Sequence, residues 1–327
     1  MKAVYITEFG DVENLELREI PDLPAPTGDQ VLVRVRAAGL NRADILQVLG
    51  VYPPPPLYSQ NIPGLEFAGE IAATGENVKN LSAGDRVFGI TAGEAQAEFL
   101  SIDESLLTRI PENLGFVEAA AVPEAFITAH DAIFTLGDLK RGETLLIHAV
   151  GSGVGLAALQ LAKAKGATVI GTSRTADKLG KCREFGLDSS ILADKAVFAE
   201  AVKTLTSGRG VDVILDLVGA AYFTQNLDCL TLKGRLILVG LTSGRTAEFN
   251  LGLALQKRAT IIGTVLRARP TDEKAEATGR FAHDVVPLFE TGTLRPNLDQ
   301  VFPAKDVIAA YKYLESNESF GKVIVEF

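Results

Sequence analysis

The stretch from residue 145 to residue 174 combines the hydrophobic patterns of a strand, a helix and a second strand. Residues 145–150 are almost continuously apolar, which is typical of a short buried parallel strand. Apolar residues then recur at helical spacing until Gly166, a residue that tolerates the left-handed conformation at a helix end. Residues 168–172 are rich in β-formers again, so we expect a βαβ unit here.

A glycine cluster at positions 151, 153 and 155 lies between the first strand and the helix. Backbone N–H groups at such a turn face outward from a helix N-terminus, and missing side chains let a pyrophosphate approach them. The spacing departs from the strict Gly-x-Gly-x-x-Gly pattern, because Val150 and Ser152 occupy two of its glycine positions. The surrounding strand, turn and helix still favour a dinucleotide site over a merely tight connection.

The pattern before this unit is rich in short strands. Residues 30–37 alternate between apolar and polar with period two, and the prolines at positions 53–56 exclude that segment from the inside of a sheet. We expect residues 1–122 to form a twisted antiparallel or barrel-like β domain. Its expected strands are residues 3–6, 15–20, 30–37, 63–71 and 84–88, with a short helix over 41–49.

Strands and helices alternate between residues 123 and 266, and the strands are nearly continuous apolar runs. This pattern is typical of an α/β domain with a doubly wound, six-stranded parallel sheet. Residues 267–327 fit no further repeat, so we expect them to return to the first domain. The six expected strands are residues 145–150, 168–172, 190–192, 211–218, 235–239 and 260–266.

Composition and charge narrow the possible partners. The 32 Lys and Arg residues against 41 Asp and Glu residues give a net charge of −9 without a basic cluster, which disfavours nucleic acid. The N-terminus lacks the apolar core of a signal peptide, and the glycines and polar residues of 144–162 argue against a membrane span. Cys182 and Cys229 are too few for a disulfide framework or a zinc knuckle. We expect a cytoplasmic protein.

Several short motifs together carry a family resemblance over essentially the whole chain. The sequence resembles the medium-chain dehydrogenase/reductase superfamily, specifically its zinc-independent quinone oxidoreductases. The pairing of residues 41–44 (Asn-Arg-Ala-Asp) with residues 52–55 (Tyr-Pro-Pro-Pro) looks most like the quinone oxidoreductases induced by a tumour-suppressor transcription factor and their bacterial relatives. The resemblance implies a GroES-like catalytic domain and a Rossmann domain. The matching motifs are residues 38–44, 52–55, 63–66, 84–87, 123–129 and 152–155.

The zinc alcohol dehydrogenases of this superfamily place a Cys, a His-Glu pair and a second Cys or Asp at three of these positions. This chain has Asn41, Leu65 followed by Glu66, and Glu124 there. Without thiolate or imidazole, the remaining carboxylates do not make a zinc site of the usual character. His148, one of only three histidines, lies on an expected buried strand and is interpreted as a satisfied core residue. We therefore expect no catalytic metal.

The end of the second parallel strand favours NADPH over NADH. NAD-preferring folds carry an acid there for the ribose 2′-OH. This chain has Ser173 and Arg174 instead, with Lys178 in the next helix, and both cations would pair with a 2′-phosphate. The alternative is that both are solvated charges. Ala193 replaces a tyrosine that the family often adds, which weakens the phosphate pocket without reversing the prediction.

The resemblance implies the remaining site residues. Asn41 and Tyr52 would be catalytic, with Tyr52 either donating a proton or only packing over the substrate, and Thr128 would bond the nicotinamide carboxamide. The predicted cofactor-binding residues are Thr128, Ser152, Gly153, Val154, Ser173, Arg174, Lys178, Gly240, Leu241, Leu266 and Lys322.

These observations favour an NADPH-dependent quinone reductase acting on a small-molecule quinone or a similar electrophile. A second reading is an NADPH-dependent enoyl or alkenal reductase, which uses the same cofactor geometry. A third is a crystallin-like or RNA-binding protein in which NADPH only stabilises the fold. The apolar last strand, residues 259–266, would be an exposed edge in a monomer, so we also expect a homodimer.

Overall fold

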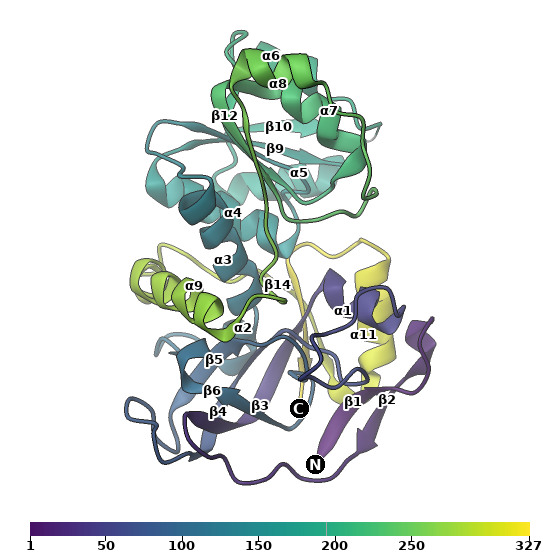
Figure 1. Ribbon diagram of the computed structural model, residues 1–327, viewed down its shortest axis with the longest axis vertical. Helices are drawn as coiled ribbons and strands as arrows, with labels where there is room; N and C mark the ends of the chain where they lie inside the picture. Colours follow the sequence, from purple (N-terminus) through teal and green to yellow (C-terminus); the bar gives the residue numbers. More distant parts are fainter. Residues whose placement is uncertain (194) are drawn as a thin grey trace. The chain divides into compact units, whose positions relative to one another are not determined.

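The computed structural model describes residues 1–193 and 195–327, and they form two compact units. The β-rich unit comprises Met1–Ile127 and Leu266–Phe327, and the parallel-sheet unit comprises Thr128–Val265 (Figure 1). Both chain termini belong to the β-rich unit. Among the described residues, no helix combines the length and the apolar character needed to cross a bilayer.

The β-rich unit is built on a seven-stranded sheet in which β3 is central. The order is β14-β15-β3-β4-β5-β7, with β6 also paired to β3, and β1 and β2 form a separate antiparallel pair. Alternate residues of β3 (Val31, Val33, Val35) are buried, as its period-two pattern predicts. The strands are β1 (Lys2–Ile6), β2 (Leu15–Glu19), β3 (Gln30–Leu40), β4 (Glu66–Thr74), β5 (Arg86–Ile90), β6 (Phe99–Asp103), β7 (Leu107–Arg109), β14 (Leu298–Pro303) and β15 (Lys322–Glu326).

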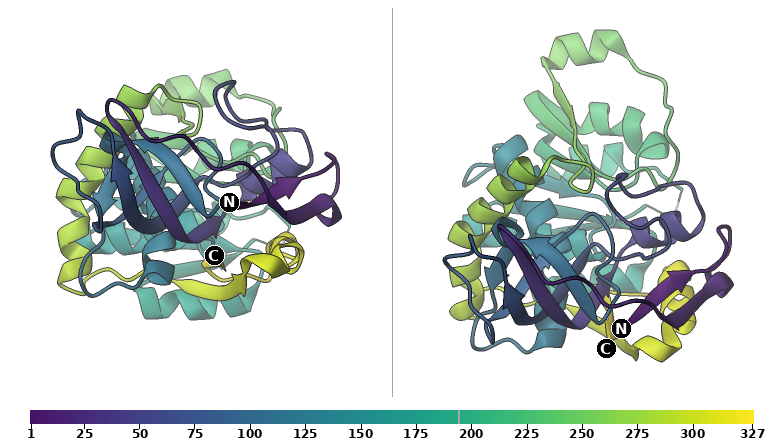
Figure 2. Two further views of the ribbon diagram at one scale, coloured as in Figure 1. Left: turned by 90° about the horizontal axis from the view of Figure 1, so that it is seen from below. Right: turned by 60° about the horizontal axis from the view of Figure 1, so that its bottom comes forward.

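The C-terminal segment completes this sheet. Strand β15 pairs antiparallel with β3, so that Val325 faces Ala38 in the register, and Figure 2 shows the yellow C-terminal strand within the β-rich unit. Tyr311 of α11 is fully buried in the same hydrophobic cluster as Leu40 and Val325. The helices of this unit are α1 (Arg42–Val48), α2 (Phe116–Ala120), α9 (Thr271–Asp284), α10 (Val286–Glu290) and α11 (Val307–Glu315), while α3 (Pro123–His130) crosses into the parallel-sheet unit.

The parallel-sheet unit has six parallel strands in the order β10-β9-β8-β11-β12-β13. This confirms the predicted doubly wound sheet. Its strand order reverses between β8 and β11, which is where such sheets bind ligands at their carboxyl ends. The strands are β8 (Thr144–Ile147), β9 (Thr168–Ser173), β10 (Ser189–Leu192), β11 (Val211–Asp216), β12 (Leu230–Leu238) and β13 (Thr260–Gly263).

Three expected strands are shorter than the apolar runs that predicted them. Strand β8 ends at Ile147, because Ala149 turns the chain with φ of 49°. Strand β11 ends at Asp216, whose carboxylate accepts N–H bonds from Val218 and Gly219 and so closes a turn. Strand β13 ends at Gly263, so the edge strand proposed for dimerisation is only four residues long.

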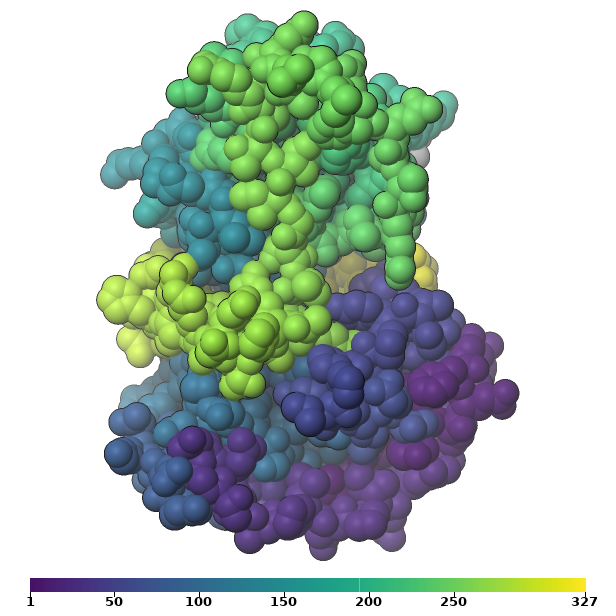
Figure 3. Space-filling view, in the orientation of Figure 1, coloured from purple at the N-terminus to yellow at the C-terminus, as the bar shows by residue number. Residues whose placement is uncertain are grey.

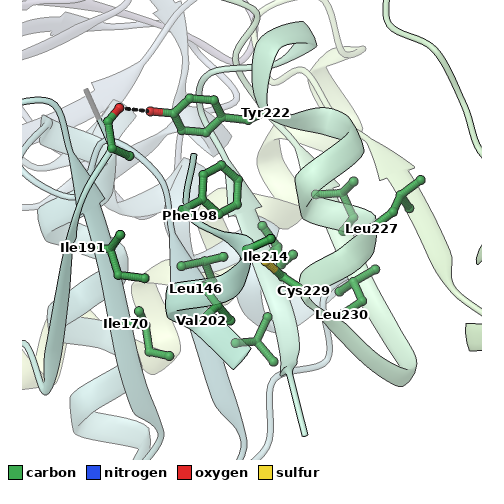
Figure 4. Packing of buried hydrophobic residues seen from close by; sticks show 14 residues of the cluster. Leu146, Ile170, Ile191, Phe198, Val202, Ile214, Tyr222, Leu227, Cys229 and Leu230 are labelled. Carbon is green, nitrogen blue, oxygen red and sulfur yellow. Dashed lines mark hydrogen bonds between the residues drawn. The ribbon is translucent and has the colours of Figure 1, made fainter. Parts of the chain in front are cut away.

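One hydrophobic cluster of this unit lies between the sheet and the helices α6 and α7. Leu146, Ile170 and Ile214 project from three neighbouring strands toward Phe198 and Tyr222 (Figure 4). The Tyr222 hydroxyl donates to the Ala193 carbonyl at 3.1 Å, drawn as a dashed line in the same figure. The helices are α4 (Gly153–Lys165), α5 (Ala176–Cys182), α6 (Ala199–Leu205), α7 (Ala220–Cys229) and α8 (Leu251–Lys257).

Candidate functional site

The turn between β8 and α4 is shaped to receive an anion. A Cβ atom on Gly155 would lie 2.5 Å from the Ala149 carbonyl oxygen, so only glycine lets α4 pack this closely on the strand end. Ser152 caps the helix, and its hydroxyl oxygen accepts the Gly155 N–H at 3.2 Å. The N–H groups of Gly153 and Val154 stand in the first turn of α4, which offers them no intrahelical acceptor. These groups suit a pyrophosphate.

The end of β9 presents a cation at the same edge of the sheet. Arg174 follows the strand directly, is exposed, and has no hydrogen bond or ion pair with any described residue. Ser173 is buried beside it, and its hydroxyl accepts the Thr175 N–H at 3.3 Å. Lys178 lies half-buried on α5. The cation that the sequence assigns to a 2′-phosphate is therefore accessible.

Two more predicted cofactor residues follow β12. The Gly240 N–H donates to the Asp216 carbonyl at 3.1 Å, which joins the end of β12 to the end of β11. Leu241 beside it is exposed. Since the six strands are parallel, the ends of β8, β9, β11 and β12 all lie at one edge, and the predicted residues Ser152, Gly153, Val154, Ser173, Arg174, Lys178, Gly240 and Leu241 gather there.

His148 is a satisfied core residue, as its place on an expected buried strand predicted. The ring is fully buried, with Nδ1 2.9 Å from the Thr172 hydroxyl and Nε2 2.6 Å from Asn226 Oδ1. The Asn226 amide donates in turn to Asp216 Oδ2 at 2.9 Å. Burial lowers the pKa of His148 to about 4 and raises the pKa of Asp216 to about 6. We call these four residues the histidine cluster.

The second group of interest lies in the β-rich unit, around the fully buried carboxylate of Glu66 on β4. Its Oε1 lies 2.5 Å from the Lys322 ammonium and accepts the Asn41 amide N–H at 2.9 Å, and its Oε2 accepts the Glu124 backbone N–H at 2.8 Å. A side chain at Gly39, opposite Glu66 on β3, would overlap the carboxylate. We call Asn41, Glu66 and Lys322 the lysine cluster.

Lys322 has all three of its N–H directions engaged inside this unit. Besides Glu66, its ammonium donates to the Leu40 carbonyl and to Asn41 Oδ1, each at 2.7 Å. Its predicted contact with the cofactor stays a prediction. The same ammonium fixes Asn41, whose amide oxygen accepts from Lys322 while its nitrogen donates to Glu66.

Zinc, which related dehydrogenases hold at this place, does not fit these residues. Asn41, Leu65 and Glu124 supply neither thiolate nor imidazole, and the Lys322 cation already lies against Asn41 and Glu66. Among the described residues, no three His, Cys, Asp or Glu side chains form a group that could hold a metal ion. Burial, followed by the negative charge of Glu66, raises the pKa of Glu124 to about 8, which favours a protonated acid.

Tyr52 lies in the same unit with its ring half-buried and its hydroxyl group without a hydrogen-bond partner among the described residues. The guanidinium of Arg267 lies over this ring, 5.1 Å from its centroid. The residue pattern did not point to Arg267. The available signal was that Arg267 directly follows Leu266 at the end of an apolar run. A charged side chain in such a buried place needs hydrogen-bond or ion-pair partners.

Thr128, on α3, has a buried hydroxyl group that lacks a hydrogen-bond partner among residues 1–193 and 195–327. A buried polar atom of this kind costs free energy unless a ligand satisfies it. The contact between Thr128 and a carboxamide stays a prediction.

The chain matches two protein families side by side. Residues 27–135 match the alcohol dehydrogenase GroES-like domain, and residues 153–282 match the zinc-binding dehydrogenase family. A human quinone oxidoreductase is 30% identical over 327 residues, covering 99% of this chain and 97% of that protein. The pikromycin polyketide synthase component PikAII of Streptomyces venezuelae is 35% identical over 97% of this chain, but the chain spans only 8% of that protein's length.

Solved structures point in the same two directions. The Escherichia coli quinone oxidoreductase in complex with NADPH has a TM-score of 0.91 at 29% identity, with both chains covered completely. The JamJ enoyl reductase in its apo form has a TM-score of 0.88 at 28% identity, covering 99% of this chain and 98% of that one. The fold and the oxidoreductase class are thus shared with reductases of two substrate types.

Proposed function

Because the chain belongs to the medium-chain dehydrogenase/reductase superfamily, in which it is an oxidoreductase, we propose that it reduces quinones with NADPH and without a metal ion. The observation that carries this proposal is the Lys322 ammonium, bound to Asn41 Oδ1 and Glu66 Oε1 at the place where related dehydrogenases hold zinc. A quinone is already a good hydride acceptor, so positioning can replace Lewis-acid activation. The Asn41 and Tyr52 motifs further support placement in the tumour-suppressor-inducible branch.

The residues at the carboxyl edge of the parallel sheet suit NADPH. The N–H groups of Gly153 and Val154 would hold its pyrophosphate, Arg174 its 2′-phosphate and the Thr128 hydroxyl its carboxamide. When bound there, NADPH would supply a hydride to the acceptor. Arg174 supports NADPH rather than NADH because it is exposed and unpaired among the described residues.

The proton would come from Tyr52. As the quinone accepts a hydride, negative charge grows on one oxygen, and the phenol O–H can donate its proton there. Quinone, hydride and proton together give the hydroquinone, and the tyrosinate recovers a proton from water. The unpartnered hydroxyl group of Tyr52 supports this role, because no described side chain competes for its proton. If Tyr52 is only a packing lid, water donates the proton instead.

An enoyl or alkenal reductase is the second candidate, and the polyketide synthase relatives and the enoyl reductase structures favour it. Hydride addition to an activated C=C bond uses the same cofactor geometry and also needs no zinc. The two candidates differ only in the molecule that accepts the hydride, a quinone or an activated C=C bond.

Steady-state oxidation of NADPH separates the two candidates. The purified protein is assayed with an ortho-quinone and with an enoyl thioester, each over a range of concentrations, and with NADH in parallel. We expect a kcat/KM for the quinone at least tenfold above that for the thioester. The reverse order would assign the chain to the enoyl reductases, and no turnover with either acceptor would contradict both.

We also propose that two copies pair along β13. The short strand β13 leaves one edge of the sheet unpaired among the described residues. Helix α8, which precedes it in the chain, exposes 69% of the surface of Leu251 and 77% of the surface of Leu255. The segment coloured near residue 250 lies at the surface in Figure 3. A monomeric mass at micromolar concentration, measured by light scattering, would contradict the pairing.

A further inference from the structure

We propose that Arg267 is a positioning residue that holds Tyr52 ready to donate its proton. The inference rests on the proposed function for its catalytic consequence, but the contacts that carry it can be tested without turnover. Arg267 is the second residue of the segment that returns to the β-rich unit, and only 4% of its surface is exposed.

The guanidinium of Arg267 joins three separate segments of the β-rich unit. Its Nε donates to the Ala92 carbonyl at 2.8 Å, its Nη1 donates to the Tyr52 carbonyl at 3.0 Å, and its Nη2 donates to Gln47 Oε1 on α1. Gln47 is itself buried and donates to the Gln60 carbonyl at 3.0 Å. The forked head group therefore anchors the main chain of Tyr52 to two fixed points of the unit.

The burial of the Arg267 guanidinium has to be explained, because burying a charge costs free energy unless the charge is paired and hydrogen-bonded. No carboxylate among the described residues lies within ion-pair distance of Arg267, and its hydrogen bonds go to two carbonyls and one amide oxygen. Lysine could not make the same contacts, because its donors all lie on one nitrogen, whereas these three acceptors are reached from three separate nitrogens of a planar guanidinium. These contacts fix the position of the Tyr52 main chain and do not neutralise the charge of Arg267.

The same group also acts on the ring of Tyr52. The guanidinium carbon lies 5.1 Å from the ring centroid, within the range of a cation–π contact. Burial raises the pKa of the Tyr52 phenol, the nearby positive charge of Arg267 opposes that rise, and the carboxyl of Glu124 adds to it. Arg267 thus keeps the phenol more acidic than its surroundings alone would, which favours proton donation.

Two substitutions separate anchoring from charge. Arg267→Lys keeps a positive charge and loses the fork, whereas Arg267→Met loses both. Arg280→Met on α9 is the matched control, since that arginine pairs with Glu276 at an exposed surface of the same unit. Each variant is first checked for wild-type thermal unfolding and NADPH affinity, so that a folding defect is recognised.

The readouts are kcat for the quinone and the titration of Tyr52 followed by NMR. Protein labelled with [ζ-¹³C]tyrosine gives six signals, and the one missing in Tyr52→Phe belongs to Tyr52. We expect Arg267→Met to raise the midpoint of the Tyr52 titration by about one pH unit. We expect both Arg267 variants to lower kcat about 10-fold, the lower end of acid–base effects, and the Arg280 control to change neither quantity.

A double-variant cycle distinguishes positioning from a merely structural role. In a Tyr52→Phe background the Arg267 substitutions should change kcat less than about twofold, because the group they position is already gone. An equal loss of kcat in both backgrounds would overturn the proposal, and so would an unchanged Tyr52 titration in Arg267→Met. If the wild-type protein reduces no quinone, the proposed function fails, while the NMR titration still decides whether Arg267 acts on Tyr52.

Discussion

The two units of this protein place their charge differently. The β-rich unit buries the ammonium of Lys322 and the guanidinium of Arg267, and each makes three contacts with oxygen acceptors of that unit. The parallel-sheet unit buries a neutral imidazole, His148, and leaves the cation Arg174 exposed and unpaired among the described residues. The two buried cations of the first unit therefore hold its segments together, whereas Arg174 of the second unit is accessible to solvent.

This difference follows from what each buried cluster must satisfy. In the lysine cluster, one carboxylate and one ammonium neutralise each other, and an amide fills the remaining positions. In the histidine cluster, each donor meets an acceptor in a chain from Thr172 through His148 and Asn226 to Asp216, and burial keeps the imidazole uncharged. Removing one member should therefore have different consequences in the two clusters.

The largest effect is expected in the lysine cluster. Lys322→Met would leave the Glu66 carboxylate buried without its cation, and breaking a buried pair in this way costs about 3–5 kcal/mol. The free energy of unfolding, measured by urea denaturation, should fall by that amount. Removing both charges in Glu66→Leu/Lys322→Met should restore part of the loss, because no lone buried charge remains.

An exposed ion pair serves as the control for that measurement. Glu276→Ala breaks the pair with Arg280 at the surface of α9, and such pairs contribute at most about 1 kcal/mol. If Lys322→Met costs no more than Glu276→Ala, the lysine cluster is not a buried ion pair in solution and the contrast between the units fails.

The second prediction concerns the pH dependence of stability. His148 has a pKa of about 4 when folded and 6.5 when unfolded, so the unfolded chain binds the proton more readily. Its contribution is complete above about pH 6.5 and is lost as the pH falls toward 4, by about 3 kcal/mol at most. Wild-type protein should therefore lose stability relative to His148→Gln across this range.

The comparison with a variant is needed because Asp216 titrates in the opposite sense. Its folded pKa of about 6 exceeds the ordinary value of 3.8, so its protonation stabilises the folded state as the pH falls from 6. His283→Gln provides the control, since that histidine is exposed on α9. A stability difference between wild type and His148→Gln that does not vary with pH would mean that His148 is not buried as a neutral ring.

Strong periodicity made most of the fold predictable. The six parallel strands and the helix after the glycine turn follow from apolar runs and helical spacing. Strands β6, β7 and β14 and helix α8 were not predicted. They are short, and their burial is set by partners far along the chain, as when β6 pairs with β3, so local pattern gave little signal.

The site was predictable where backbone geometry or charge marks it. The glycine turn and Arg174 stand out in the sequence because strand ends and helix starts fix their place. The engagement of Lys322 with Asn41 and Glu66 was not predictable, because 281 residues separate Lys322 from Asn41. Arg267 likewise reaches Gln47 across 220 residues, and only the tertiary fold brings such groups together.

The third prediction uses the exposed cation of the parallel-sheet unit. Charge-assisted hydrogen bonds contribute roughly 1.5–3 kcal/mol each, so Arg174→Ala should weaken NADPH binding about 10- to 100-fold. NADH, which lacks the 2′-phosphate, should bind nearly as well as before. Isothermal titration with both cofactors measures this, with Lys181→Ala on α5 as a control, because Lys181 already pairs with Asp177. Equal losses for the two cofactors would remove Arg174 from the phosphate site.

The smallest effect is expected from the group that the β-rich unit leaves unsatisfied. Tyr52→Phe removes one hydroxyl that has no hydrogen-bond partner among the described residues, so stability should change little. If that hydroxyl supplies the proton, kcat for quinone reduction should fall about 10-fold or more, while NADPH affinity is kept. Tyr5→Phe is the control, because Tyr5 also lies under a cation: the guanidinium carbon of Arg18 is 4.2 Å from its ring centroid.

Wild-type turnover in Tyr52→Phe would leave Tyr52 as a packing residue and water as the proton source. Loss of NADPH binding would mean instead that the loop carrying Tyr52 supports the cofactor, and the division of charge between the two units would no longer separate structure from ligand binding.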